Sequence, residues 1–140
     1  MIDIYSIEID SLYEDTNLSP HMEDYIEAIA FLSEKNKVVR VKDIAALLKI
    51  KMPSVTSALN KLKEIGLIDY EKYGFIELTK KGIVISDRVI SKHLCLKEFF
   101  NKVLDLPDGK SGDEACKIEH HIEPETCKRI HKLLVYMNSD

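Results

Sequence analysis

Cys116, Glu119 and His120 carry three kinds of side chain that bind metal ions: a thiol, a carboxylate and an imidazole. Their positions are i, i+3 and i+4, which share one face if the segment is helical. Together they would supply most of the first coordination shell of a soft or borderline divalent metal. The alternative is a buried cysteine beside a solvated glutamate and histidine, and these residues alone do not decide between the two.

Local signals predict the helix that this arrangement needs. Ser111 and Glu114 have the spacing of a capping box, so we expect a helix to begin at Ser111. Pro124 stops this helix, because residues just before a proline avoid the helical region, and it opens the last helix of the chain.

Composition bounds the class of protein. A chain of 140 residues with 45% hydrophobic and 31% charged residues forms one compact domain or two small subdomains. No stretch is long and apolar enough for a membrane span, and the first residues lack a secretory pattern, so we expect no membrane partner. Three cysteines without an export signal predict reduced thiols in a cytoplasmic protein.

The net charge of −4 hides a segregation along the chain. Residues 1–34 hold nine acidic side chains and no Lys or Arg. Residues 35–63 hold eight basic side chains against Asp43 alone. A basic block of this kind is typical of a surface that contacts phosphates, although a solvated face would have the same composition.

An acidic pair lies near the start of the first long helix, which Ser19 and Pro20 predict through a capping hydroxyl and a proline at the first turn. Asp24 and Glu27 lie opposite its apolar face. Carboxylates in the first turns suit the positive end of the helix dipole, which would explain them without a metal. The predicted core face consists of Met22, Tyr25, Ile26, Ile29 and Leu32.

The next elements follow the order of a winged helix-turn-helix. We expect an extended piece at 38–41, helices at 42–48 and 53–65, and a hairpin of strands at 67–70 and 75–78. Gly66 should end the second of these helices. The outer face of the 53–65 helix presents short hydroxyls and long cations, which suits the DNA major groove. The same order of elements also serves protein–protein contacts, but the basic block falls on it and favours DNA.

A long helix should begin at Thr79, whose hydroxyl can cap it, and should run to about Leu104. Its apolar residues fall in two rows. A helix that is apolar on two sides needs two partners, so we expect one row to face its own subunit and the other a second copy. His93 lies between the rows, where a histidine is more often a core residue than a ligand. Residues 1–18 fit neither a helix nor a strand, and we assign them no function.

Taken together, residues 19–139 resemble the DtxR/MntR family of metal-dependent transcriptional repressors. The stretches that carry the resemblance are Met22–Glu27, Pro53–Thr56, Tyr70–Gly74, and Asp113–His121 beside His93. The resemblance implies a mainly α fold. An N-terminal extension (1–18) would precede a winged helix-turn-helix (19–78) and a helical dimerisation and metal-binding domain (79–140).

The resemblance also implies which residues act. A homodimer would bind double-stranded operator DNA and control iron or manganese homeostasis genes. Metal would draw the first helix onto the helical part and so fix the separation of the two recognition helices. The implied metal ligands are Asp24, Glu27, His93, Cys116, Glu119 and His120. The implied DNA contacts are Lys51, Pro53, Ser54 and Ser57 at bases or groove walls, and Lys37, Arg40, Lys61, Lys72 and Tyr73 at phosphates.

The ligand set is a hybrid of two family types. Cysteine at position 116 is typical of iron responders, whereas aspartate at position 24 is typical of manganese responders. Lys97 and Gly112 replace ligands of the ancillary site of the iron type, so we expect that site to be absent. Because a thiolate favours iron over manganese, Fe(II) is the first choice and Mn(II) the second.

Two other functions are compatible with parts of the sequence. Cys116 and His120 have the residue types of a nucleophile and a base. The chain shows no source of oxyanion donors and no phosphate loop, and its histidines lack the His-Glu-x-x-His spacing of zinc proteases, so we expect no enzyme. A metal-independent winged-helix regulator that responds to a small organic ligand is the other alternative.

Overall fold

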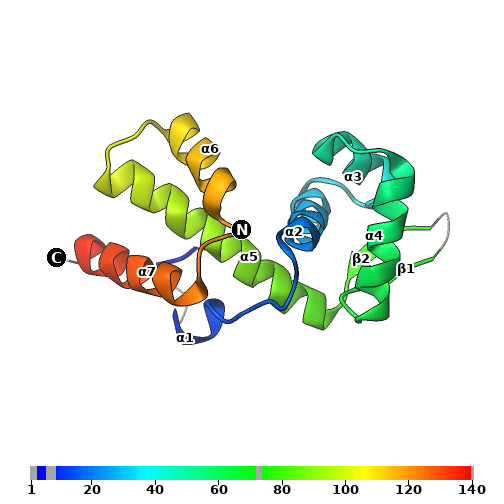
Figure 1. The fold of residues 1–140 in the computed structure, drawn as a ribbon, viewed down its shortest axis with the longest axis horizontal. Helices are drawn as coiled ribbons and strands as arrows, with labels where there is room; N and C mark the ends of the chain where they lie inside the picture. Colours follow the sequence, from blue (N-terminus) through cyan, green and yellow to red (C-terminus); the bar gives the residue numbers. More distant parts are fainter. Residues whose placement is uncertain (1–2, 6–8, 72–73, 140) are drawn as a thin grey trace. The chain divides into compact units, whose positions relative to one another are not determined.

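The computed structural model describes residues 3–5, 9–71 and 74–139. The fold is mainly helical with one two-stranded sheet, as expected (Figure 1). The elements are α1 (Ile9–Leu12), α2 (Pro20–Lys35), α3 (Val41–Leu48), α4 (Met52–Glu64), β1 (Ile68–Tyr70), β2 (Ile76–Leu78), α5 (Lys80–Glu98), the π-helix η1 (Phe99–Val103), α6 (Asp108–Ile118) and α7 (Pro124–Asn138).

The chain divides into two compact units. The N-terminal unit is Leu18–Ser86, and the C-terminal unit combines Asp87–Asp140 with the first 17 residues. We call residues 3–5 and 9–17 the N-terminal arm. The chain therefore begins on one unit, forms the other, and returns to the first through α5.

The N-terminal unit is a winged helix-turn-helix. Ser19 caps α2 by accepting a hydrogen bond from the backbone of Met22, as the Ser-Pro signal predicts. Gly66 ends α4 at a φ of 82°, a conformation that costs glycine little. The two strands of the wing are antiparallel, and Ile68 pairs with Leu78. The fully buried side chains of this unit include Tyr25, Ile26, Ile29, Ile44, Leu59 and Leu62.

The wing joins α5 through a close backbone packing. Thr79 Oγ1 accepts a hydrogen bond from the Gly82 backbone and donates one to the carbonyl of Gly66, which confirms the predicted cap. A Cβ added at Gly82 would lie 1.9 Å from the carbonyl oxygen of Leu67. The first turn of α5 is therefore pressed against the start of the wing, and only glycine fits there.

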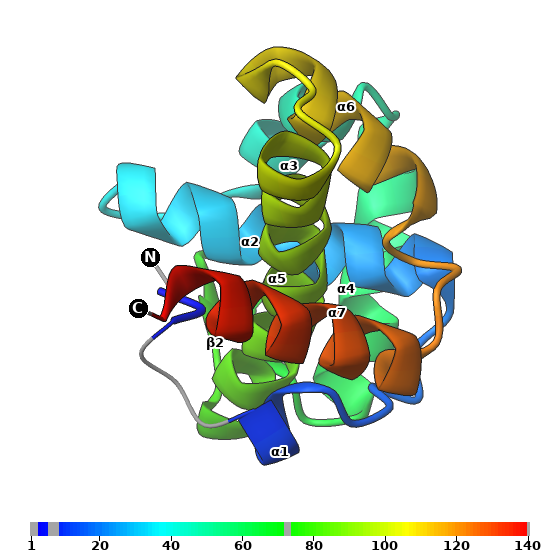
Figure 2. The ribbon, with the colours of Figure 1, turned by 90° about the vertical axis from the view of Figure 1, so that its left-hand side faces the viewer.

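The N-terminal arm completes the core of the C-terminal unit. Ile4, Leu12 and Tyr13 are three of the six buried residues in one core cluster, with Cys95, Cys127 and Leu134 as the others. Figures 1 and 2 both show α1 beside α7. The arm thus packs on the body of its own subunit.

One imidazole holds the arm at two points. The His131 ring is fully buried, its Nε2 donates to the carbonyl of Ile4, and its Nδ1 accepts from the Tyr13 hydroxyl at 2.6 Å. The bond to the Ile4 carbonyl needs a proton on Nε2, and in the neutral ring this leaves Nδ1 as the acceptor for the Tyr13 hydroxyl. Burial lowers the pKa of His131, whereas the hydrogen bond to the Ile4 backbone raises it, and the net shift is downward.

Substitution of Gly82 should separate backbone packing from helix propensity. Gly82→Ala should lower the free energy of unfolding by about 1–3 kcal/mol, because the new methyl group meets a backbone oxygen that cannot move alone. Gly112→Ala in α6 is the matched control: its Cβ has no other heavy atom within 4 Å, and it should gain up to about 1 kcal/mol of helix propensity. Urea unfolding measures both, and equal stabilities would contradict the close packing.

The buried His131 should make stability depend on pH. Its folded-state pKa lies below the unfolded value of about 6.5, so the unfolded chain binds the extra proton between the two values. The free energy of unfolding should therefore fall as pH drops below about 6.5, with a slope of up to about 1.4 kcal/mol per pH unit. His131→Gln, which stays neutral, should lose this part of the slope in urea unfolding between pH 7.5 and 5. Equal slopes would show that His131 does not titrate as described.

Candidate metal centre and DNA-binding surface

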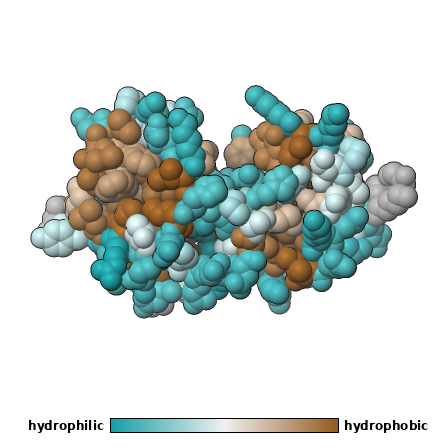
Figure 3. Space-filling view, viewed as in Figure 1, coloured by the Kyte–Doolittle hydropathy of each residue, from teal (hydrophilic) through white to brown (hydrophobic). Residues whose placement is uncertain are grey.

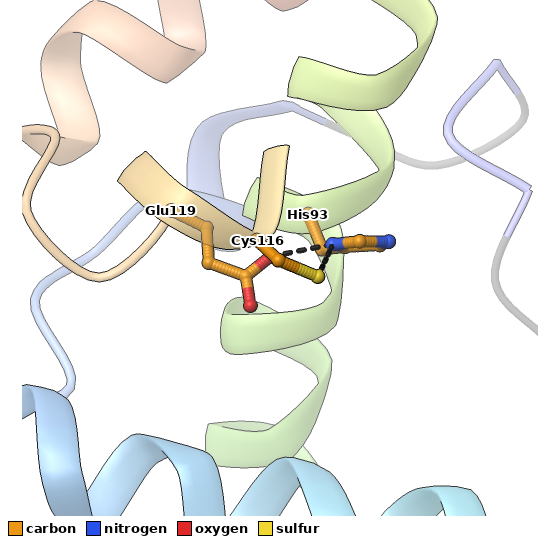
Figure 4. A group of neighbouring side chains, drawn as sticks. All are labelled: His93, Cys116 and Glu119. Carbon is orange, nitrogen blue, oxygen red and sulfur yellow. Dashed lines mark hydrogen bonds and ion pairs between the residues drawn. The ribbon is translucent and has the colours of Figure 1, made fainter. Parts of the chain in front are cut away.

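His93 on α5 meets the end of α6. His93 Nδ1 lies 2.6 Å from Glu119 Oε2 and 3.8 Å from the sulfur of Cys116. The ligand atoms of these three residues all lie within 4.8 Å of one another. Figure 4 shows the imidazole pointing toward both the carboxylate and the thiol. His93 is thus part of a polar cluster and not a core residue.

The helix that carries Cys116 begins earlier than predicted. α6 starts at Asp108, after Pro107 in an extended conformation, and Ser111 lies inside it. The Ser111 hydroxyl donates to the carbonyl of Leu106 and does not cap the helix. The expected capping box at this position is therefore wrong, because the turn that follows Pro107 already starts the helix.

α6 ends at Ile118, so Glu119 is its C-cap and His120 lies in the turn that follows. Glu119 keeps a helical conformation, with φ −58° and ψ −32°. Cys116, Glu119 and His120 therefore keep the relation that the i, i+3 and i+4 spacing predicts. His120 Nε2 lies 3.2 Å from Glu119 Oε1, so each carboxylate oxygen has its own imidazole partner.

The sequence left open a buried cysteine beside a solvated glutamate, and the structure shows the reverse. Glu119 is 1% exposed and Cys116 is exposed. Burial raises the pKa of the Glu119 carboxyl, but hydrogen bonds with His120 and His93 and their charges lower it, and the pKa falls to about 2. Glu119 is therefore ionised at any physiological pH. A buried anion flanked by two imidazoles and an exposed thiol suits a cation.

The donor atoms fit a divalent transition metal. The cluster supplies one sulfur, imidazole nitrogens and a carboxylate oxygen, and such mixed sets favour ions of borderline softness. Cys95 and Cys127, by contrast, are buried, and burial raises the pKa of each thiol, to about 12 for Cys95 and about 11 for Cys127. Only Cys116 among the three cysteines has the exposure that a metal ligand needs.

The acidic pair of α2 belongs to the N-terminal unit. Asp24 and Glu27 are both half-buried and lie i, i+3 apart on one side of the helix. Tyr25, Ile26 and Ile29 fill the other side and are fully buried. The predicted core face of α2 is confirmed for Tyr25, Ile26, Ile29 and Leu32, whereas Met22 is half-buried and lines a groove. The role of Asp24 and Glu27 as ligands stays a prediction.

The outer face of α4 is exposed and polar. Lys51, Pro53, Ser54, Ser57 and Lys61 are all exposed, as a surface that contacts DNA requires. Ser54, Ser57 and Lys61 also line a groove of about 410 Å³. The other lining residues are His21 and Met22 of α2 with Pro53 and Ala58 of α4. The sequence analysis did not name His21 as part of this surface. Its position in the first turn of the helix that begins after Ser19 was the one signal that could have indicated it.

Arg40, another predicted phosphate contact, packs near the wing. Arg40 lies over the ring of Phe75, with its guanidinium carbon 4.9 Å from the ring centre. Lys37 is exposed nearby in the sequence. Lys72 and Tyr73, the two predicted phosphate contacts at the wing tip, lie outside the described residues.

Comparison with known families decides what this arrangement belongs to. The model of the iron-dependent repressor N-terminal DNA-binding domain matches residues 17–76. The model of the iron-dependent repressor metal-binding and dimerisation domain matches residues 79–140. The chain belongs to the DtxR/MntR family of metal-dependent transcriptional repressors.

Individual relatives agree with this family. An uncharacterized HTH-type transcriptional regulator of Methanocaldococcus jannaschii is 37% identical over 114 residues, which are 81% of this chain and 91% of the relative. The manganese regulator SloR superposes with a TM-score of 0.70 at 28% identity, over 85% of this chain and 55% of that one. IdeR of T. acidophilum gives 0.72 at 25% identity, over 80% and 53%. The chain spans about half the length of these solved relatives.

These relatives are transcriptional regulators, which confirms the expectation that this repressor is not an enzyme. Within the described residues, no helix combines the length and the hydrophobicity needed to cross a membrane.

Proposed function

We propose that this repressor is activated by a divalent metal and binds operator DNA as a homodimer to control iron or manganese homeostasis genes, with Fe(II) preferred over Mn(II). The meeting of His93 with Cys116 and Glu119 supports the proposal most, because two separate helices supply the ligand atoms. We further propose that Asp24, Glu27 and His120 complete the ligand set. The carboxylates of Asp24 and Glu27 lie on one side of α2, opposite the side that packs in the core.

The proposed switch works through the charges of these residues. A bound dication would supply positive charge and directional bonds at the carboxylates. Without it, Asp24, Glu27 and Glu119 repel one another, which opposes their assembly into one site. The DNA-competent state must bind the metal more tightly than the other state. A coupling of about 3 kcal/mol would change operator affinity roughly 100-fold.

Cys116 supports iron as the preferred metal. A thiolate binds softer ions more strongly than Mn(II), whose usual ligands are carboxylates and other oxygens. Asp24 acts in the opposite direction, which keeps Mn(II) as the second choice. Zinc would bind strongly in vitro whatever the cellular metal, since affinity rises along the first-row series, and affinity alone therefore does not identify it.

The proposed DNA surface combines α4 with the basic residues around it. Ser54 and Ser57 are short enough for base edges or groove walls, whereas Lys37, Arg40 and Lys61 reach phosphates. A homodimer is supported by exposed hydrophobic residues on the C-terminal unit, which gather at the left of Figure 3. The large exposed hydrophobic residues of this unit include Leu104, Ile118, Leu133, Val135 and Met137.

Removing one ligand should abolish the metal response. Cys116→Ala and His120→Ala should lose metal-dependent DNA binding, because each removes a donor atom from the proposed set. His121→Ala is the matched control, since His121 is exposed and adjacent in sequence but outside the set. Fluorescence anisotropy with a DNA fragment selected by the metal-loaded protein measures the response. Unfolding curves should show that all three variants are folded, and a normal metal response in the Cys116 and His120 variants would disprove the site.

Exchanging the thiol should change the metal preference. Cys116→Glu replaces a soft donor with a hard one, so the Mn(II) concentration for half-maximal DNA binding should fall relative to that of Fe(II). The measurement is the same anisotropy titration with buffered Fe(II) or Mn(II) under anaerobic, reducing conditions. An unchanged Fe(II)/Mn(II) ratio would show that Cys116 does not set selectivity.

A further inference from the structure

The groove between α2 and α4 lies wholly within the N-terminal unit. The two helices pack against each other, and the groove lies where they meet. Ser54, Ser57 and Lys61 line it on the α4 side. These three residues also belong to the proposed DNA surface, so the groove continues that surface toward α2.

His21 is the polar side chain that α2 contributes to this groove. It is exposed, and it lies in the first turn of the helix that Ser19 caps. Its ring makes a T-shaped contact with the ring of Tyr25, one turn further along α2, with ring centroids 4.9 Å apart and planes at 88°. Because Tyr25 is fully buried in the core, this contact holds the imidazole at a defined place on the groove wall.

The groove has the chemistry of a surface that binds phosphate. Lys61 supplies a positive charge, Ser54 and Ser57 supply hydroxyl groups, and the His21 ring can donate a hydrogen bond. None of the described residues that line the groove carries a carboxylate. Donors of these kinds contact the phosphates of a DNA backbone. A helix in the major groove has a backbone strand on each side, so the strand on the α2 side would run over the groove.

We propose that the groove between α2 and α4 seats a backbone phosphate of duplex DNA and that His21 contacts this phosphate directly. The inference rests on the proposed function, in which α4 presents its exposed face to operator DNA. It adds a residue of α2 to the DNA surface. A phosphate contact carries no sequence information, so His21 strengthens binding to every duplex and fixes the position of α4 in the major groove.

A charge series at position 21 tests the contact. His21→Lys, His21→Ala and His21→Glu place a cation, a neutral methyl group and an anion at the groove wall. The matched control is the same series at Ser33, an exposed residue about 18 Å further along α2 that does not line the groove. Fluorescence anisotropy with saturating Mn(II) measures binding to the DNA fragment selected by the metal-loaded protein and to an unrelated duplex.

The affinity for DNA should follow the charge at position 21. His21→Lys should bind at least as tightly as the parent. His21→Ala should bind about two- to tenfold more weakly, the range expected for one lost hydrogen bond. His21→Glu should bind more weakly still, because its carboxylate repels the phosphate. Each variant should change its affinity for the two duplexes by the same factor.

The dependence on salt should identify the phosphate as the partner. A cation at a phosphate releases a counterion from the DNA. In a plot of the logarithm of affinity against the logarithm of salt concentration, His21→Lys should therefore steepen the slope by up to about 0.9. The Ser33 variants should keep the slope and the affinity of the parent.

The stability of α2 should show the opposite trend, which separates binding from folding. The helix dipole favours a carboxylate in the first turn and disfavours a cation there. Urea unfolding should therefore find His21→Glu at least as stable as His21→Lys, although it binds DNA more weakly. The weak binding of His21→Glu then cannot result from a loss of fold.

The outcomes separate this contact from the proposed function. If DNA binding by the parent ignores metal, the proposed function fails, and the charge series still tests the groove. If the His21 variants bind DNA like the parent, or if the Ser33 series changes affinity as much, the contact is disproved. An effect confined to the selected fragment would also overturn it, because a phosphate contact acts on every sequence.

Discussion

The Glu119 carboxylate, shared between two imidazole rings, is the interaction on which the candidate site depends. A buried ionised carboxylate is expensive unless its oxygens are satisfied. Here His93 bonds one oxygen and His120 faces the other. Because His93 comes from α5 and Glu119 from the end of α6, this shared anion holds the two helices at the point where the exposed thiol of Cys116 lies. The contacts of the Glu119 carboxylate with His93 and His120 therefore hold the side chains of the cluster in place.

The uneven charge along the chain has a structural meaning. Acidic residues of the arm are used inside the C-terminal unit, where Asp10 pairs with Lys128 and Glu14 with Arg88. The cations of α4, in contrast, remain exposed. A chain with a net charge of −4 can thus present a basic surface, because local potential and not the total charge governs contact with phosphates.

Local signals predicted local structure well. The Ser19-Pro20 start of α2, the glycine stop of α4, the wing hairpin and the Thr79 cap each depend on a few neighbouring residues, and each is present. The prediction that Ser111 starts a helix was wrong, because the helix already begins in the turn after Pro107. The common face of Cys116, Glu119 and His120 followed from spacing alone.

Features that depend on distant contacts could not be predicted in this way. His93 approaches Glu119 only because α5 and α6 pack together, and only the family resemblance indicated the pair. The burial of Glu119 and the exposure of Cys116 are also set by packing, so the spacing of the two residues along the chain could not predict them. The arm was unreadable for the same reason: its main partner, His131, lies 118 residues from Tyr13.

That separation has a consequence for how the molecule is made. The N-terminal unit is one continuous segment, so it can fold while the residues after it are still being synthesised. The arm is synthesised well before its buried partners Cys127, His131 and Leu134. Ile4, Leu12 and Tyr13 therefore cannot reach their native packing until more than a hundred further residues have been made.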